Sequence, residues 1–240
     1  MARRRFFVSE VRNHRAELAG EEALHLTRVL RVERGQRYEI SDNRAVYLAE
    51  VEEAHRNRVV FAVVGELAPR EAPVRLTLMV ALIRFDRLEW VLEKGTELDV
   101  ERFLLVEAER SERGLEKAAP KRIERWERIL RESSQQCRRD RLPALGGPAP
   151  LEEALAWAAD FRYRLEEAEG APPAVKVLPA ERRSRDAVAV LVGPEGGWTE
   201  RERRMAGETG WQAVSLGPQI LRAETAAIAA AALVQNVWLP

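Results

Sequence analysis

The sequence predicts two domains, a small β-rich domain over residues 1–70 and a larger α/β domain over residues 74–240. Three observations predict this division. Runs rich in β-branched and aromatic residues dominate as far as residue 67, a segment with two prolines follows at 68–73, and strand-like and helix-like segments alternate from there onward. Such alternation is typical of a parallel sheet whose strands are joined by helices.

The N-terminal domain is expected to be a small β-barrel. Polar turns separate its β-rich runs, and one short helix over residues 21–30 interrupts them. The clearest strands are predicted at 37–41, 45–51 and 58–64.

In the C-terminal domain, apolar runs alternate with segments of helical periodicity. Thr199 and Glu202 form a capping box that opens one helix, and Gly210 is placed to end it. Residues 142–150, which are rich in glycine and proline, are predicted to form a loop. Strands are predicted at 74–83, 103–106, 161–165, 187–192 and 213–216, and helices at 85–98, 121–139, 151–159, 199–209 and 224–237.

The helix at 121–139 is amphipathic and lies in a region with an excess of positive charge. Trp126 and Cys137 fall on its apolar stripe, so we expect Trp126 in the core and Cys137 as a small buried hydrophobe. Residues 110–141 hold eleven basic and six acidic side chains. A charged helix face is usually only solvated, but this excess equally favours a surface that faces RNA, and the sequence leaves both open.

The composition excludes several classes of protein. Lysine plus arginine and aspartate plus glutamate number 39 each, and the resulting net charge of zero argues against a wholly basic nucleic-acid coat. With Cys137 as the single cysteine and three histidines, an intrachain disulfide and a Cys/His zinc cluster are excluded. The most apolar segment, 226–234, is too short to span a membrane. We therefore expect a cytoplasmic protein with no membrane partner and no metal.

Two glycine-bearing loops follow consecutive strands of the α/β domain. Gly193-Pro-Glu-Gly-Gly197 comes directly after Val192, and Gly217-Pro-Gln-Ile-Leu-Arg222 comes directly after Leu216. In open α/β sheets ligands bind at the carboxyl ends of strands, and glycine lets a ligand approach the backbone closely. Gly-Pro pairs also mark ordinary turns, but three glycines around one glutamate favour a ligand site. The loops match neither the dinucleotide-binding motif nor the P-loop.

The last predicted helix, 224–237, is unusually rich in alanine. Alanine favours helix by itself, and small side chains also let a neighbouring segment pack closely. The sequence does not decide between these two explanations.

Together these segments resemble a known family. The sequence Leu-Val-Gly-Pro-Glu-Gly-Gly-Trp-Thr-Glu-Arg-Glu at 191–202 and the sequence Leu-Gly-Pro-Gln-Ile-Leu-Arg-Ala-Glu-Thr-Ala-Ala at 216–227 resemble the paired C-terminal motifs of the RsmE family. Matching blocks at 25–31, 93–98 and 133–143 extend the resemblance over nearly the whole chain. Members of this family are SPOUT-class methyltransferases that methylate N3 of a uridine in 16S ribosomal RNA.

The resemblance implies a fold and partners that periodicity does not predict. The fold is an α/β SPOUT methyltransferase domain with a C-terminal trefoil knot, preceded by a PUA-like RNA-binding barrel. Knots are too rare to be inferred from a sequence pattern alone. The implied cofactor is S-adenosyl-L-methionine, the implied substrate is 16S rRNA or the small ribosomal subunit, and the implied assembly is a homodimer with the site near its interface.

The resemblance also implies site residues by position. Arg222 and Glu195 are expected nearest to the reacting base, where either a carboxylate takes the N3 proton or Arg222 stabilises the uridine anion. RNA contacts are expected from His25, Arg28, Arg31, Arg125 and Arg139. The donor is expected to bind against Leu165, Glu166, Leu191, Val192, Gly193, Pro194, Glu195, Gly196, Leu216, Gly217, Ile220, Leu221, Arg222 and Thr225.

Two other functions compete with methyl transfer as the function of this sequence. The glycine loop and the Leu-Arg-x-Glu-Thr segment are intact, which argues against a non-catalytic RNA-binding assembly factor. An oxidoreductase would need an acidic ribose partner about 20 residues past the loop, and none is there.

Some residues depart from the pattern of the RsmE family. They are Asp99 and Arg138 in place of glycine, Gln135 in place of Glu, Cys137 in place of Ser, Gln219 in place of Arg, and Ala223 in place of Thr.

Overall fold

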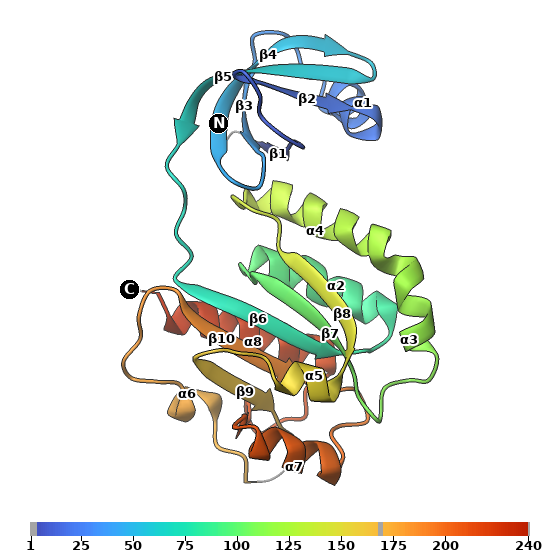
Figure 1. Cartoon of the computed structure of the whole chain (residues 1–240), viewed down its shortest axis with the longest axis vertical. Coiled ribbons are helices and arrows are strands. Elements are labelled where there is room, and N and C mark those ends of the chain that lie inside the picture. Colours follow the sequence, from blue (N-terminus) through green and yellow to red (C-terminus); the bar gives the residue numbers. More distant parts are fainter. Residues whose placement is uncertain (1–3, 168–169, 240) are drawn as a thin grey trace. The chain divides into compact units, whose positions relative to one another are not determined.

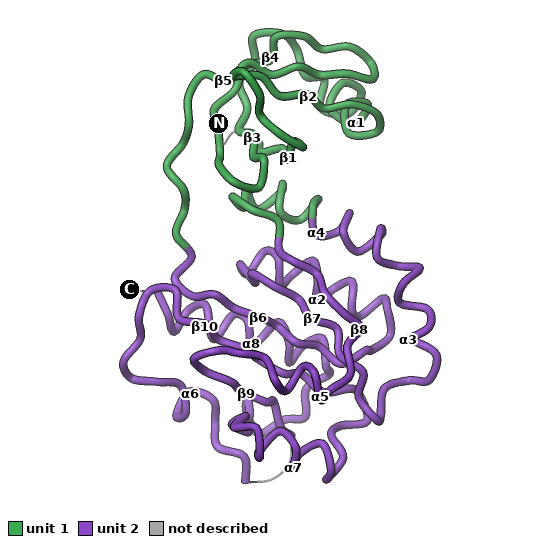
Figure 2. The backbone as a smooth tube through the Cα atoms, viewed as in Figure 1, with its two compact units in different colours: residues 1–71, 131–142 green, residues 72–130, 143–240 purple. Residues whose placement is uncertain are grey.

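The computed structural model of the chain describes residues 4–167 and 170–239. It divides into two compact units, which Figure 2 shows in different colours. The first unit comprises the residues up to Glu71 together with Arg131–Leu142, and the second comprises Ala72–Leu130 and the chain from Pro143 onward. The segment Arg131–Leu142 therefore packs with the N-terminal residues, although in sequence it lies inside the α/β region.

The first unit is built on a five-stranded sheet with the strand order β1-β3-β4-β5-β2. β1 is parallel to β3, and the other neighbouring pairs are antiparallel. Within the described residues the sheet has β1 and β2 at its two edges, so its closure into a barrel stays a prediction. Its elements are β1 (Arg5–Phe7), β2 (Arg15–Ala19), α1 (Gly20–Arg28), β3 (Arg37–Ser41), β4 (Val46–His55) and β5 (Arg58–Leu67).

The second unit holds a six-stranded sheet in which every neighbouring pair is parallel, which confirms the predicted α/β class (Figure 1). The strand order is β11-β9-β10-β6-β7-β8. Its strands are β6 (Val74–Ala81), β7 (Arg102–Glu107), β8 (Ala144–Pro150), β9 (Phe161–Leu165), β10 (Asp186–Val192) and β11 (Gln212–Val214).

Helices join and cover these strands. No helix within residues 4–167 and 170–239 is long and apolar enough to cross a membrane. The helices are α2 (Phe85–Glu97), α3 (Leu115–Ala118), a 3-10 turn (Ala119–Arg122), α4 (Ile123–Cys137), α5 (Leu151–Leu155), α6 (Ala174–Val177), α7 (Glu200–Glu208) and α8 (Ala223–Val237).

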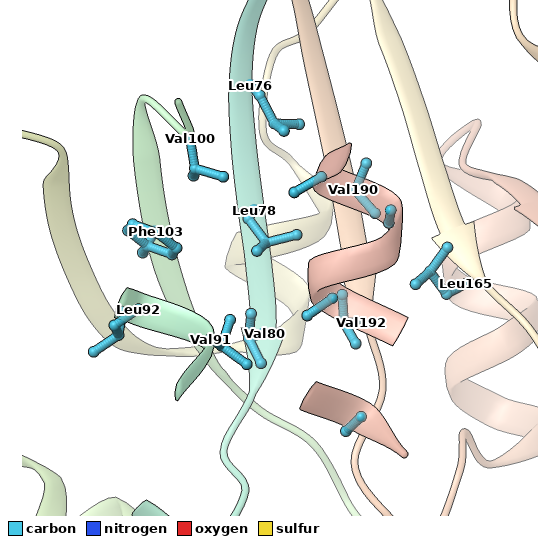
Figure 3. Packing of buried hydrophobic residues seen from close by; sticks show 14 of the residues in the cluster. Leu76, Leu78, Val80, Val91, Leu92, Val100, Phe103, Leu165, Val190 and Val192 are labelled. Atoms are coloured by element: carbon cyan, nitrogen blue, oxygen red, sulfur yellow. The ribbon is translucent and has the colours of Figure 1, made fainter. Parts of the chain in front are cut away.

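Side chains of the central strands alternate between two hydrophobic clusters, because successive residues of a strand point to opposite faces. Leu78 and Val80 belong to the larger cluster, which includes α2, α4 and α8. Met79 and Leu191 belong to the other cluster, with α5 and α7. Figure 3 shows part of the larger cluster, where Phe103 of β7 lies near the β6 side chains. Both faces of the sheet are thus buried, as parallel sheets require.

Residues 142–150, predicted to be a loop, contain an edge strand instead. β8 pairs in parallel with β7. Gly147 has a φ of +85°, and a Cβ there would lie 2.3 Å from the carbonyl oxygen of Leu105, so only glycine allows this approach. Glycine and proline were the reason for predicting a loop, but both are tolerated in an edge strand.

The alanines of α8 pack closely on the sheet. Ala227, Ala230 and Ala231 are buried in the main core, and α8 contacts α2, β6 and β10. Close packing, and not helix propensity alone, therefore accounts for the alanine content.

Two further helix predictions can be compared with the structure. In α4, Trp126 is fully buried, as predicted. Cys137 is only half-buried, which corrects the expectation of a buried hydrophobe, because it is the last residue of the helix. In α7 the capping box is present: Thr199 Oγ1 accepts from the Glu202 amide at 3.2 Å, and the Glu202 carboxylate accepts from the Thr199 amide at 2.8 Å.

We predict that Gly95→Ala destabilises the protein by up to about 2 kcal/mol. A Cβ at Gly95 of α2 would lie 2.7 Å from the buried Phe103 ring. Overpacking costs about 1–3 kcal/mol, which outweighs the gain of about 1 kcal/mol in helix propensity. Denaturant unfolding followed by circular dichroism measures the change.

Gly207→Ala in α7 is the matched control. A Cβ there would meet no atom within 4 Å, so the same substitution is expected to stabilise by up to about 1 kcal/mol. Equal effects of the two substitutions would contradict the proposed close contact of α2 with β7.

Candidate functional site

Three loops that follow neighbouring parallel strands meet at one cavity. The strands β11, β9 and β10 are consecutive in the sheet, and because they are parallel their carboxyl ends lie at the same edge. The loops that follow them, with Arg87 from the first turn of α2, line a cavity of about 290 Å³. This is the position at which open α/β sheets bind ligands.

Most of the residues expected to bind the donor line this cavity. Leu191 does not, because it points to the opposite face of the sheet and packs with α5 and α7. Gly196 and Thr225 do not line it either, and the Gly196 carbonyl accepts from Arg110 at 3.0 Å instead. The expected residues on its wall are Leu165, Glu166, Val192, Gly193, Pro194, Glu195, Leu216, Gly217, Ile220, Leu221 and Arg222.

A buried indole holds the glycine loop in place. The Trp198 Nε1–H donates to the carbonyl oxygen of Leu165 at 3.0 Å and so joins the loop after β10 to the end of β9. A Cβ at Gly193 would lie 3.0 Å from the Trp198 ring, which explains why glycine occupies that position. The Gly197 amide donates to the Pro194 carbonyl at 2.9 Å and closes the turn.

The carboxylate of Glu166 is fixed by two arginines. Arg203 of α7 donates to it at 2.9 and 3.2 Å, and Arg164 also forms an ion pair with it. The carboxylate raises the pKa of Arg203, chiefly through this hydrogen bond. The Glu166 amide donates to the Val214 carbonyl at 2.9 Å, so main chain and side chain are both held. Glu166 is therefore a rigid, charge-compensated part of the cavity wall.

Arg87 is the main residue that sequence reasoning missed. Its guanidinium forms an ion pair with Glu195 and lies 3.8 Å from the Glu224 carboxylate. Glu224 is 8% exposed, and its Oε2 is buried without a hydrogen-bond partner in the described structure. A usable signal existed, because Arg87 follows β6, and β6 is the neighbour of β10 in the sheet.

The cavity thus combines exposed backbone with charged groups of both signs. Arg222 is exposed at the N-terminus of α8, and Glu195, on the loop after β10, lines the same cavity. Such a site can accept a proton on a carboxylate and stabilise developing negative charge with a guanidinium. Among residues 4–167 and 170–239, no group of three or more His, Cys, Asp or Glu side chains is placed to hold a metal ion.

The residues expected to contact RNA lie outside this cavity. His25 and Arg28 are exposed on α1, and Arg31 is exposed just after it. Arg139 follows α4 and belongs to the first unit. Arg125 belongs to the second unit, where it donates to Glu89 at 2.6 and 2.7 Å, and this pairing lowers the pKa of Glu89. The structure therefore brings four of the five together in one unit and leaves Arg125 in the other.

The chain is similar to known proteins over most of its length. Residues 70–235 match the RNA methyltransferase domain family. The chain is 30% identical to the ribosomal RNA small subunit methyltransferase E of Bacillus subtilis over 217 residues, or 87% of this chain and 85% of that protein. It is 28% identical to the protein of the same name from Aquifex aeolicus, over 96% of this chain and 98% of that protein.

A solved structure is similar over the whole chain. The ribosomal RNA small subunit methyltransferase E from Neisseria gonorrhoeae, bound to S-adenosyl methionine, has a TM-score of 0.87 and 30% identity to this chain. The match covers 99% of this chain and 98% of that one.

We predict that Trp198→Phe destabilises the protein by about 1–3 kcal/mol, because the buried Leu165 carbonyl loses its hydrogen-bond donor. It should also speed hydrogen exchange of the Gly197 amide, since the loop loses its link to β9. Denaturant unfolding and exchange measured by nuclear magnetic resonance test the two effects.

Trp211→Phe provides the matched control. Trp211 is also buried and donates from Nε1 to the Leu155 carbonyl at 3.1 Å, away from the cavity. Its loss should cost similar stability but leave exchange at Gly197 unchanged. The same exchange rate in both variants would contradict a specific role of Trp198 in holding the loop.

Proposed function

Because the chain belongs to the ribosomal RNA small subunit methyltransferase E (RsmE) family of RNA methyltransferases, we propose that it transfers a methyl group from S-adenosylmethionine to N3 of one uridine in 16S ribosomal RNA. The observation that carries the proposal is the cavity at which the loops after β9, β10 and β11 meet. The names of the relatives support small-subunit ribosomal RNA as the substrate.

The residues present fit the proposed donor. A Cβ at Gly217 would meet no protein atom within 4 Å, so the space beside that residue is open to a ligand. Main-chain groups of the loops at 193–197 and 216–222 are proposed to bind adenine and ribose, because the glycines leave the backbone accessible. S-adenosylmethionine, when bound, supplies a methyl group that its sulfonium has already activated.

The chain's own task is to position the uridine and manage its N3 proton. Glu195, whose carboxylate is held by Arg87, is proposed to accept that proton. Arg222 is proposed to stabilise the negative charge that the ring gains as the proton leaves. The target base must be unpaired or flipped out of a helix to reach these groups.

The C-terminal segment is proposed to form the trefoil knot. The residues that end β11 lie between two parts of the chain: the Glu166 amide donates to Val214, and on the other side Ala174 donates to the Ser215 carbonyl at 2.8 Å. Ser215 in turn donates to the Pro172 carbonyl at 2.9 Å. From there the chain enters α8, which packs on β6 in the middle of the sheet. This enclosure supports the proposal that the C-terminal segment passes through a loop of the chain and forms a knot.

The remaining organisation is proposed on the family relationship. Residues 1–70 would form a PUA-like RNA-binding barrel and residues 74–240 the SPOUT domain. His25, Arg28, Arg31, Arg125 and Arg139 would contact RNA, and the five-stranded sheet of the first unit is compatible with this role. We further propose that the protein works in the cytoplasm as a homodimer.

We predict that Arg222→Ala abolishes methyl transfer and leaves the fold intact. Arg222 is exposed and makes no side-chain cap to α8, so its loss should change stability by no more than about 0.5 kcal/mol. The measurement is transfer of a labelled methyl group from S-adenosylmethionine to small ribosomal subunits, with circular dichroism on the same samples.

Arg204→Ala serves as the control, because Arg204 is exposed on α7 and does not line the cavity. It should retain full activity. If Arg222→Ala methylates as fast as the unaltered chain, the assigned role is wrong. If the unaltered chain binds RNA but neither binds the donor nor methylates, a non-catalytic assembly factor is the better description.

A further inference from the structure

A buried carboxylate lies next to the methyl-transfer cavity without being part of its wall. Glu224 belongs to the first turn of α8, is 8% exposed and does not line the cavity. Within residues 4–167 and 170–239, its Oε2 is buried and has no hydrogen-bond partner. Burying a charged group costs free energy unless it is paired and hydrogen-bonded. Glu224 therefore has an acceptor capacity that the structure leaves unused.

Arg87 lies between this carboxylate and the cavity. Its Nη1 forms an ion pair with Glu195, and its Nε lies 3.8 Å from Oε1 of Glu224, which is too long for a hydrogen bond. Arg87 and Glu195 both line the cavity, whereas Glu224 does not. A guanidinium carries donors on both Nε and its terminal nitrogens. A small movement of the Arg87 side chain would therefore complete a hydrogen bond from Nε to Glu224.

The two carboxylates differ in how firmly they can hold Arg87. The Glu195 side chain is 37% exposed, and the Glu224 side chain is 11% exposed. Water screens an exposed ion pair, so such a pair contributes little, and a charge pair away from water attracts more strongly at the same distance. Glu195 is also the carboxylate that a substrate can reach. The pair of Arg87 with Glu195 is thus the one that the reaction can break.

We propose that Glu224 is a positioning residue that takes Arg87 from Glu195 when Glu195 becomes protonated. The N3–H bond of the uridine breaks, its electron pair stays on N3, and the proton forms an O–H bond with Glu195. The neutral carboxyl group attracts the guanidinium less, so Arg87 completes its hydrogen bond to Glu224. The electron pair on N3 then forms the bond to the methyl carbon of S-adenosylmethionine as the carbon–sulfur bond breaks, with its electron pair going to sulfur.

This exchange of partners keeps a cation at the cavity while the uridine is negatively charged. Arg87 would be compensated from its buried side by Glu224, and its remaining donors would stay at the cavity wall, which it lines together with Arg222. Donors held in place before the charge develops stabilise it without reorganisation. The inference rests on the proposed function, because it takes Glu195 as the group that accepts the N3 proton.

Glu195→Gln tests the exchange of partners without any substrate, because glutamine imitates the neutral carboxyl group. The probe is the Nε–H of Arg87 in the ligand-free protein, followed by nuclear magnetic resonance and assigned by its absence in Arg87→Lys. We expect hydrogen exchange of this group to slow by about tenfold, since a hydrogen bond to a buried carboxylate protects it. In the double variant Glu195→Gln/Glu224→Gln most of this protection should be lost.

Glu89→Gln is the matched control. Glu89 is also a glutamate next to α2 charge, two positions from Arg87 on the same helix, but it pairs with Arg125 and does not line the cavity. Exchange of the Arg87 Nε–H should therefore be the same in this variant as in the unaltered chain. An equal slowing in Glu89→Gln would contradict the inference.

Glu224→Gln tests whether the reaction uses this exchange. Its kcat on small ribosomal subunits should fall by about 10- to 100-fold, a loss up to that of one direct oxyanion donor. Its KM should stay unchanged, because the new pairing forms only as the proton leaves. The melting temperature should stay equal or rise, since an unpartnered buried charge is removed. Glu224→Asp keeps the charge and should retain more of kcat than Glu224→Gln.

Two results would overturn the inference: unchanged exchange of the Arg87 Nε–H in Glu195→Gln, or an unchanged kcat in Glu224→Gln. The first result does not depend on the folding of a Glu224 variant. If the unaltered chain methylates small subunits but Arg87 does not respond to Glu195→Gln, only the exchange of partners is wrong. If the unaltered chain does not methylate them, the proposed function fails and this inference fails with it.

Discussion

The parallel pairing of β9 with β10 and β11 is the constraint on which the candidate site depends. Strands that run in the same direction end at the same edge, and these three are neighbours in the sheet. Three loops that are far apart in the sequence therefore open onto one cavity. A shift of one residue in register would turn Leu165 and Val192 from the cavity side toward the opposite face. The hydrogen bond from Trp198 to Leu165 holds two of the loops at a fixed separation.

Charge compensation is the second requirement of this cavity. Glu166 has a side chain that is only 5% exposed, yet it lines the site as a carboxylate because Arg164 and Arg203 both bind it. Removing one partner of such a buried pair typically costs about 3–5 kcal/mol, since the other charge is left unpaired. Arg87 of α2 also pairs with Glu195, but the Glu195 side chain is exposed and this pair is therefore weaker. The wall of the site is therefore rigid before any ligand enters, which lowers the entropy cost of binding.

Sequence reasoning predicts those parts of the structure that depend on local pattern. The parallel sheet followed from apolar runs alternating with helices, and most of the cavity wall followed from two glycine-bearing loops at strand ends. The capping box of Thr199 and Glu202 has the same local origin. The resemblance to the RsmE family, and not the residue pattern, predicted S-adenosylmethionine as the methyl donor and ribosomal RNA as the substrate.

Features set by tertiary contact were not predictable in this way. Arg87 reaches Glu195 across 108 positions of sequence, and its position after β6 indicates a strand end but not the partner that it binds. β8 was missed because its glycines, which usually indicate a loop, serve a close approach to β7. Arg5, which binds both Asp140 and the Arg138 carbonyl, is one of several residues that hold Arg131–Leu142 in the first unit. Only the folded arrangement places these groups together.

The most direct measurement of the central claim is the identity of the methylated nucleoside. Small ribosomal subunits that lack the modification would be incubated with the protein and S-adenosylmethionine, and their RNA digested and analysed by liquid chromatography and mass spectrometry. The account predicts N3-methyluridine from a single position of the 16S RNA. Methyl groups on another atom or base, or none on RNA while the donor binds, would contradict it.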